Sequence, residues 1–214
     1  MSLLPLLASL ALAATPAPAA TPVAADSDPS AQTRALVTAF AAVQRVPLEG
    51  DKTPVPAAEA AAIAKLDQLL DLETIGAAAL EPHRAKLTPE QLTKIGTRFR
   101  ELVRIIAYSG GGSFFRTSQY TIGATTKPAK GEGGDVLVTA RDPQEDLEIT
   151  MTFHWRPGKA GALRLVDVSF DGDSLIGDYQ NQFGRIIGKE GAEGLLRRVE
   201  ERYQEEVRKR REAK

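Results

Sequence analysis

Residues 147–155 read Leu-Glu-Ile-Thr-Met-Thr-Phe-His-Trp, and this stretch decides the fold class. Its apolar residues alternate strictly with polar ones; they are Leu147, Ile149, Met151, Phe153 and Trp155. Successive side chains of a β-strand point to opposite faces of a sheet, so the pattern predicts a strand with one apolar and one polar face. An apolar sheet face has to be covered, and we expect helices on that side.

Three other segments share this period of two and are predicted strands: 120–122, 136–140 and 163–170. In the last of them we expect Val166, Val168 and Phe170 to face inward. The loops between the strands are short and contain residues 130–134, Asp142-Pro143 and Pro157-Gly158. Because short loops join antiparallel neighbours, the sequence predicts a four-stranded antiparallel meander with one apolar face.

Helical spacing of apolar residues precedes and follows the strands. The segments are 36–43, 57–70, 71–80 and 88–108 before the sheet, and 175–188 and 195–207 after it. The clearest start lies at Thr88, Pro89 and Gln91, which fit an N-cap, a first helical position and a capping box. Helices, then strands, then helices predict a single α+β domain over residues 31–207, with the sheet packed under the helices.

The composition excludes several classes of function. The chain has 214 residues, of which 43% are hydrophobic and 26% charged, and its formal net charge is -1. Nucleic acid is not an expected partner, because phosphate binding needs a dense excess of Lys and Arg. The chain has no cysteine, which excludes disulfides and thiolate sites. The basic tail, 208–214, is either a solvated last helical turn or a contact with an anionic membrane or partner.

The N-terminus is typical of an export signal. Leu3 to Ala14 form an apolar run that is too short to span a bilayer, and small and proline residues follow to Ala20. We therefore predict a cleavable signal peptide at residues 1–20, a disordered leader at 21–30, and a mature protein in the periplasm. The alternative is a disordered Ala/Pro tail with no targeting role.

Few residues could carry catalysis. His83 and His154 are far apart in the sequence, and His154 falls on the polar face of its strand, where it is interpreted as a surface residue. Asp171, Asp173 and Asp178 lack the register of a calcium loop, and Asp173 or Ser174 is a natural N-cap for the following helix. We therefore expect no enzyme activity, no metal and no cofactor.

Residues 165–183, Leu-Val-Asp-Val-Ser-Phe-Asp-Gly-Asp-Ser-Leu-Ile followed by Gly-Asp-Tyr-Gln-Asn-Gln-Phe, resemble a signature of the Mla lipid-shuttle family. This family is the soluble periplasmic component of the maintenance-of-lipid-asymmetry system, also called the toluene-tolerance auxiliary component. Its pattern there is roughly D-V-x-V-D-G-V-S-L followed by Y-R-x-x-F. Residues 87–91, 99–102 and 152–156 resemble further elements, so the resemblance covers roughly 31–203. Asp173 and Gln180 depart from the pattern, at positions where the family has a small apolar residue and Arg.

The resemblance implies a phospholipid as cargo and docking in turn on two complexes. These are an outer-membrane lipoprotein complex and an inner-membrane ABC transporter of the mammalian-cell-entry type. We expect the carrier to be a monomer. Two other functions stay open, namely a periplasmic binder of another apolar ligand or scaffold, and a small hydrolase or isomerase on a similar curved sheet.

Physical chemistry agrees with a carrier. Roughly 30 methylenes at about 0.8 kcal/mol each give a penalty on the order of 20 kcal/mol for exposing two acyl chains to water. An apolar cavity between sheet and helices would remove this penalty and needs no acid–base groups. The predicted lining is Leu102, Ile106, Phe114, Phe115, Ile122, Val138, Ile149, Met151, Phe153, Val168 and Tyr179.

A glycine triplet lies between the helix at 88–108 and the first strand. Gly110, Gly111 and Gly112 are predicted to end the helix. The segment 109–116 could also be a gate, because glycine lowers the barrier to backbone rearrangement and Phe114 and Phe115 could swing with it. The sequence leaves the plain terminator and the gate open.

Overall fold

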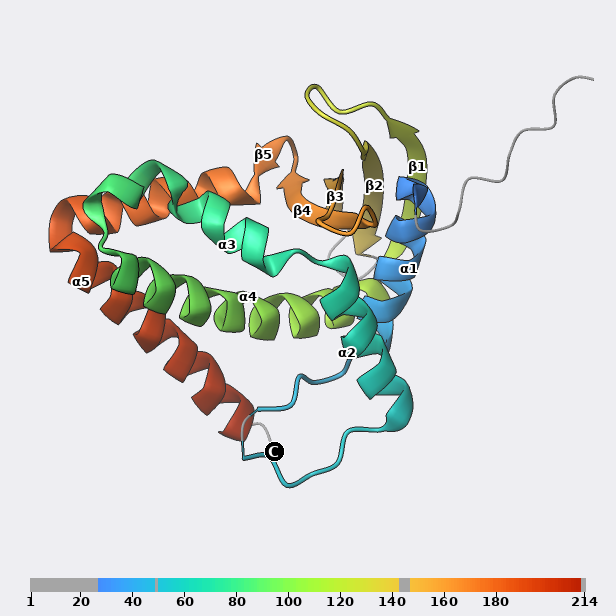
Figure 1. The fold of residues 1–214 in the computed structure, drawn as a ribbon. Helices are drawn as coiled ribbons and strands as arrows, with labels where there is room; N and C mark the ends of the chain where they lie inside the picture. The colour runs from blue at the N-terminus through green and yellow to red at the C-terminus, as the bar shows by residue number, and fades with distance from the viewer. Residues whose placement is uncertain (1–26, 49, 143–146, 213–214) are drawn as a thin grey trace, which may run out of the picture.

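The computed structural model describes residues 27–48, 50–142 and 147–212 (Figure 1). The helices before the sheet are α1 (Pro29–Ala42), α2 (Ala57–Leu69), α3 (Leu72–Leu80), the 3-10 helix η2 (Glu81–Lys86) and α4 (Pro89–Thr117). The strands are β1 (Gln119–Thr126), β2 (Gly134–Asp142), β3 (Leu147–Pro157), β4 (Leu163–Phe170) and β5 (Asp173–Ser174), and α5 (Leu175–Glu212) follows. The α+β class is therefore confirmed.

The sheet has five strands in the described chain, and the prediction of four was wrong. The strands pair antiparallel in chain order from β1 to β5. The missed strand β5 follows a two-residue turn at Asp171 and Gly172, whose φ values are 49° and 97°. A tight hairpin needs positive φ at both central positions, and Asp-Gly is a favoured pair for it. This dipeptide was the sequence signal for the fifth strand.

One face of the sheet is buried against the helices. Met151 lies opposite Val138, and Phe153 lies opposite Val136, and all four side chains are almost fully buried. In β4 the prediction of an inward Val166 was wrong. Trp155 pairs with Leu165 and His154 with Asp167, so Val166 is the extra residue of a β-bulge. A bulge exchanges the two faces along a strand, which turns both Leu165 and Val168 inward.

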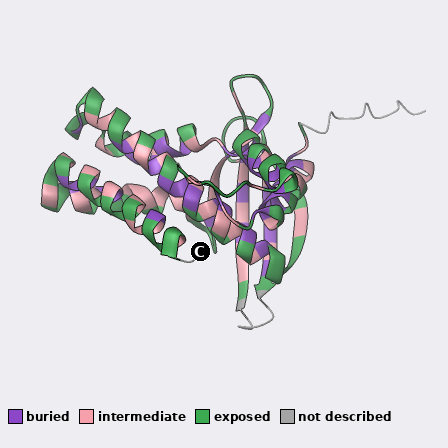
Figure 2. Ribbon diagram, turned by 90° about the horizontal axis from the view of Figure 1, so that it is seen from below, coloured by how far each residue is buried: buried purple, intermediate pink, exposed green. Residues whose placement is uncertain are grey.

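The helices gather into two hydrophobic cores that share α4. Tyr108 and Phe115, in the C-terminal half of α4, pack with α1, α2 and the sheet. Ile95 and Phe99, in its N-terminal half, pack with α3 and α5. Figure 1 shows α4 running through the molecule beneath α3 and the first part of α5, and in Figure 2 the buried residues lie between the elements.

Helix α4 does not end at the glycine triplet; it continues to Thr117. The prediction that the triplet ends the helix was therefore wrong, and the gate at 109–116 stays a prediction for a segment that is helical. A Cβ on Gly112 would overlap the carbonyl oxygen of Val43, and one on Gly111 would lie 2.8 Å from the Phe40 ring. These two glycines let α1 approach the backbone of α4. Gly110, by contrast, has open space at its Cβ position.

The chain breaks its last helix at a different glycine from the one predicted. Gly188 is helical, and Gly191, with φ 71° and ψ -175°, divides α5 into two arms. The second arm continues through the predicted basic tail, since the helix reaches Glu212. Arg210 donates to the backbone oxygen of Ile105 and to the Ser109 hydroxyl, so part of this tail is packed on α4.

The predicted signal peptide, 1–20, lies outside the described residues. The predicted disordered leader, 21–30, is corrected where it is described, because α1 begins at Pro29 with Asp28 as its N-cap. Over the described residues, no helix has the length and apolarity that crossing a membrane requires.

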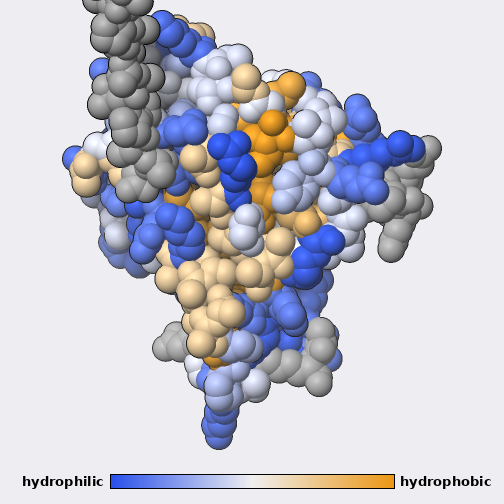
Figure 3. Space-filling model, turned by 90° about the vertical axis from the view of Figure 1, so that its right-hand side faces the viewer, coloured by the Kyte–Doolittle hydropathy of each residue, from blue (hydrophilic) through white to orange (hydrophobic). Residues whose placement is uncertain are grey.

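On the side of the molecule where α1 and α2 lie, Figure 3 shows a strongly hydrophobic band in the upper centre and a weakly hydrophobic area below it, with hydrophilic residues around both. Five alanines of α2 are exposed on its surface: Ala57, Ala58, Ala60, Ala61 and Ala64. A methyl side chain carries little apolar area, so these alanines offer little hydrophobic driving force for a ligand.

The helix contact at Gly112 predicts opposite effects for two alanine substitutions. Gly112→Ala should destabilise the protein by about 2 kcal/mol, because the methyl group overlaps a backbone oxygen that cannot move alone. Gly110→Ala should stabilise it by up to about 1 kcal/mol, because alanine is the better helix former and meets open space. Urea unfolding of both variants measures the difference. Equal stabilities would contradict the close approach of α1 and α4.

Candidate ligand-binding cleft

An apolar cleft of about 300 Å³ lies between the inner face of the sheet and the helices. The sheet contributes Ile149, Met151, Phe153, Leu165, Asp167, Val168 and Phe170. The helices and the residue that follows α2, Leu70, complete the lining with Phe40, Leu72, Ile75, Val103, Ala107, Gly110, Gly111, Phe114, Phe115 and Leu175. Asp167 is the one charged residue among them. A cleft lined in this way binds hydrocarbon and offers almost no polar partner to a ligand.

The helix wall of the cleft is one stripe of α4. Val103, Ala107, Gly110 and Phe114 recur at intervals of three and four residues, so they lie on the same face. Gly110 leaves a gap in this stripe, because no side chain fills its Cβ position. The glycine that we predicted would end the helix therefore widens the cleft.

The structure divides the eleven predicted lining residues into three groups. Six line the cleft: Phe114, Phe115, Ile149, Met151, Phe153 and Val168. Three line a separate groove between α4 and α5: Leu102, Ile106 and Tyr179. Ile122 and Val138 belong to the neighbouring hydrophobic core and do not line the cleft.

Sequence reasoning missed the contributions of α1, of Leu70 between α2 and α3, of α3 and of the start of α5. These are residues such as Phe40, Leu70, Ile75 and Leu175. Each lies on an apolar stripe that the sequence does contain. The sequence of one apolar stripe does not predict which of its residues pack in a core and which line a cleft.

Asp167 fixes the edge of the cleft where β4, β5 and α5 meet, by hydrogen bonds of its side chain. Its carboxylate accepts hydrogen bonds from the backbone N–H groups of Val168 and Ile176 and from the Ser174 hydroxyl. Ser174 in turn accepts from the Gly177 N–H at 3.1 Å, which confirms it as the N-cap of α5. Leu175 and the 43% exposed Phe170 therefore have fixed positions beside the opening.

An ion pair with an added hydrogen bond fixes α2 against α4 beside the cleft; we call Asp67 with its partners Arg104 and Tyr108 the Asp67 clamp. Arg104 donates two hydrogen bonds of 2.9 Å to the Asp67 carboxylate, and the Tyr108 hydroxyl donates a third of 2.7 Å. Partial burial pushes the pKa of Asp67 upward, but these hydrogen bonds and the Arg104 charge outweigh it and leave the pKa below 3.8. Burial and the same carboxylate raise the pKa of Tyr108 far above its ordinary value.

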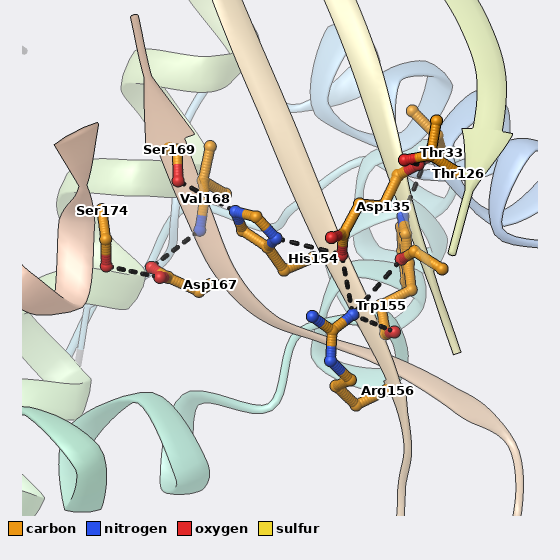
Figure 4. A network of polar contacts seen from close by, with 11 residues as sticks. Thr33, Thr126, Asp135, His154, Trp155, Arg156, Asp167, Val168, Ser169 and Ser174 are labelled. Carbon is orange, nitrogen blue, oxygen red and sulfur yellow. Dashed lines mark hydrogen bonds and ion pairs between the residues drawn. The ribbon is translucent and has the colours of Figure 1, made fainter. Parts of the chain in front are cut away.

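The polar face of the sheet brings together an arrangement that the sequence did not indicate. His154 lies between Asp135, 3.0 Å from its Nδ1, and the Ser169 hydroxyl, 2.9 Å from its Nε2 (Figure 4). Arg156 also donates to Asp135. His154 lies on the polar face of its strand as predicted, but its side chain is only 21% exposed and is bonded on both sides, so the interpretation as a surface residue is corrected to a partly buried one.

Ser169, His154 and Asp135 lie in the order of a catalytic Ser–His–Asp triad, so the access of Ser169 to a substrate matters. A nucleophile needs access to substrate and donors for a developing oxyanion. Ser169 is 8% exposed, and the three residues project from the opposite face of the sheet to the cleft. The arrangement ties β2, β3 and β4 together on the solvent side.

The other polar residues considered from the sequence serve the fold. His83 Nε2 lies 2.8 Å from the Gln180 carbonyl oxygen, and the ring packs on Gly184. The Asp171 carboxylate accepts from the Thr150 N–H. Within residues 27–48, 50–142 and 147–212, no three His, Asp or Glu side chains come together as metal ligands.

The fold and the cleft define a class of protein: an α+β domain whose sheet and helices enclose an apolar, nearly uncharged site. The sequence matches the MlaC protein family over residues 36–201, and the chain belongs to this family. The resemblance seen in the sequence is thus confirmed.

Among solved structures, the chain is similar to a phospholipid-binding protein from Ralstonia solanacearum, determined in complex with a phospholipid. The two share 19% sequence identity with a TM-score of 0.60, over 84% of this chain and 99% of the other. At that identity the likeness concerns the fold. No curated protein matches the sequence.

The Asp67 clamp predicts a loss of stability in acid. A carboxylate whose pKa is lowered by folding contributes stability above its unfolded pKa, near 3.8, and loses it as the pH falls through the lower folded value. The free energy of unfolding should therefore fall more steeply below about pH 4 in the wild type than in Asp67→Asn. Urea unfolding between pH 3 and 7 measures both slopes. Identical slopes would show that the clamp does not couple to folding.

Proposed function

We propose that this protein binds a phospholipid by its acyl chains in the cleft and carries it across the periplasm between the outer and inner membranes. The observation that carries the proposal is the apolar cleft between the sheet and the helices. Membership of the MlaC family supports it, as does the fold shared with a phospholipid-binding protein.

The chemistry of the cleft suits a carrier. Its one charged lining residue, Asp167, already accepts three hydrogen bonds, so it does not call for a cation or a proton from the ligand. Hydrocarbon would bind by exclusion from water, at about 0.8 kcal/mol for each buried methylene. The headgroup would stay at the rim beside Phe170, in contact with solvent. Binding and release then need no chemical step, and we propose no enzyme activity, cofactor or metal.

The proposed partners follow from the family. A carrier between two membranes has to receive its lipid on one side and deliver it on the other. We propose an outer-membrane lipoprotein complex and an inner-membrane ABC transporter of the mammalian-cell-entry type as these partners, with the carrier acting as a monomer. Outer-membrane asymmetry and tolerance of toluene would then depend on it.

Extraction of the purified protein with organic solvent, followed by mass spectrometry, tests the ligand. We expect phospholipid at close to one molecule per protein. Another class of apolar molecule in its place would make the protein a binder of that ligand. An empty protein that also fails to take up phospholipid from vesicles would refute the proposed function.

A substitution in the helix wall tests the place of binding. Gly110→Leu puts a side chain into the gap in the α4 stripe without a clash at its Cβ, so it should reduce bound phospholipid at least tenfold. Gly188→Leu is the matched control, because it is also a helical glycine with open space and does not line the cleft. Equal lipid content in the two folded variants would exclude the cleft as the binding site.

Export is a separate proposal, since residues 1–20 carry the sequence pattern of a signal peptide. Expression of the full chain in a Gram-negative host should give a periplasmic protein that begins after the apolar run. N-terminal sequencing of the periplasmic fraction measures the cleavage position. A protein that keeps Met1 and stays in the cytoplasm would contradict export.

A further inference from the structure

The last turns of α5 place one arginine against α4 beside the cleft. The Nη2 group of Arg210 donates hydrogen bonds of 2.7 Å to the Ile105 carbonyl oxygen and 2.6 Å to the Ser109 hydroxyl. Gly110, the next residue of α4, lines the cleft. Adjacent Cα atoms are about 3.8 Å apart, so this cation lies close to the cleft wall.

Arg210 has no carboxylate partner among the described residues, in contrast to arginines earlier in the same arm. Arg198 pairs with Glu190, and Arg202 pairs with Glu206. The hydrogen bonds that Arg210 makes are the two to α4. Burial lowers the pKa of the Arg210 guanidinium, and the charge of Glu206 offsets this only in part. A partly buried cation without a counter-ion is a favourable position for an anionic ligand.

Part of the Arg210 guanidinium is available to such a ligand. Its Nε and Nη1 groups are hydrogen-bond donors, as Nη2 is. Neither group makes a hydrogen bond within the described chain, and neither is among its buried polar atoms that lack a partner. Both groups therefore reach solvent and can donate charge-assisted hydrogen bonds to an anion.

The surface of α4 between the cleft and Arg210 is open and polar. Apart from the neighbouring helix backbone, no atom lies within 4 Å of the position that a Cβ of Gly110 would take. The exposed Ser113 follows Ser109 by one turn, so the two serines lie on the same side of the helix. A group that leaves the cleft past Gly110 therefore meets hydroxyl groups and the Arg210 guanidinium.

The acidic residues one turn before Arg210 are paired with other cations. Glu205 forms ion pairs with Arg202 and Lys209, and Glu206 pairs with the same two residues. Their charges are thus compensated locally, and they do not take up the donors of Arg210. An anion beside Arg210 would meet a net attractive charge.

A phosphate is the anion that the proposed ligand would bring to this place. When the acyl chains of a phospholipid fill the cleft, its glycerol backbone lies at the opening and its phosphate lies a few bonds farther out. A phosphodiester carries a negative charge on oxygens that accept hydrogen bonds from guanidinium and hydroxyl groups. An uncharged lipid with the same chains has no group that binds this cation.

We infer that Arg210 and Ser109 form a phosphate subsite outside the cleft, which binds the headgroup phosphate of a lipid whose chains lie inside. The inference rests on the proposed function and adds a contact that selects lipids by headgroup chemistry. The rest of the headgroup extends into solvent. The protein would then prefer phospholipids to uncharged lipids with identical chains.

Arg210→Gln tests the subsite, because it removes the charge and keeps a polar side chain. Protein freed of lipid is incubated with phosphatidylcholine vesicles that contain equal fractions of dipalmitoyl phosphatidylglycerol and dipalmitoylglycerol, and mass spectrometry identifies the lipid taken up. The ratio of bound phosphatidylglycerol to diacylglycerol should fall about tenfold from the wild-type value, since a hydrogen bond to a charged group is roughly this strong. Arg208→Gln is the matched control. It removes an exposed cation of the same turn, whose partner is Glu212, and should leave the ratio unchanged.

Ser113→Glu gives a second test that keeps the contact of Arg210 with α4. Ser113 is exposed, so the variant should fold, and its carboxylate should repel the phosphate and lower the same ratio. A wild-type ratio in either folded variant would overturn the subsite. So would an equal fall in Arg208→Gln, because the effect would then be one of net charge.

Inorganic phosphate separates a lipid subsite from a site for the free anion. Added at the concentration of the vesicle lipid, it should leave the ratio unchanged, because it has no acyl chains to hold it at the opening. A ratio lowered to that of Arg210→Gln would assign the site to free phosphate and overturn the inference. Wild-type protein that takes up no lipid at all would instead refute the proposed function.

Discussion

Helix α4 imposes the constraint on which the rest of the structure depends, because one helix has to serve two hydrophobic cores. Its N-terminal half packs with α3 and α5, and its C-terminal half packs with α1, α2 and the sheet. A rigid helix of 29 residues keeps these two cores at a fixed separation. Where its apolar stripe passes from one core to the other, the sheet and helices do not fully close. The cleft lies at this transition.

The glycines of α4 show how packing can reverse a local preference. Glycine costs a helix interior about 1 kcal/mol relative to alanine, and three in succession normally indicate an end. Here Gly111 and Gly112 allow α1 to approach the helix backbone, and Gly110 leaves room in the cleft. The energy of the α1–α4 contact offsets the poor propensity. A substitution at each position therefore reports on a different property of the molecule.

The two faces of the sheet have separate roles because of the alternation along its strands. On β3, Met151 and Phe153 face the cleft, and the next residue, His154, faces solvent in the network with Asp135 and Ser169. The polar network can stabilise the pairing of β2, β3 and β4 without placing a charge near the ligand. An apolar site and a dense hydrogen-bonding network thus share the same strands.

The sequence by itself determined the α+β class, the family, the alternation of β3 and the helical spacing of most helices, because these patterns depend only on local geometry. It also determined that Met151 and Phe153 share the inner face of a strand. Only the tertiary structure decided which stripe faces the cleft, where Val166 bulges, and that Leu102 and Tyr179 border a different groove from Phe114. These features depend on contacts between residues far apart in the chain. A hydrophobic stripe has the same pattern whether a core, a cleft or a groove lies against it.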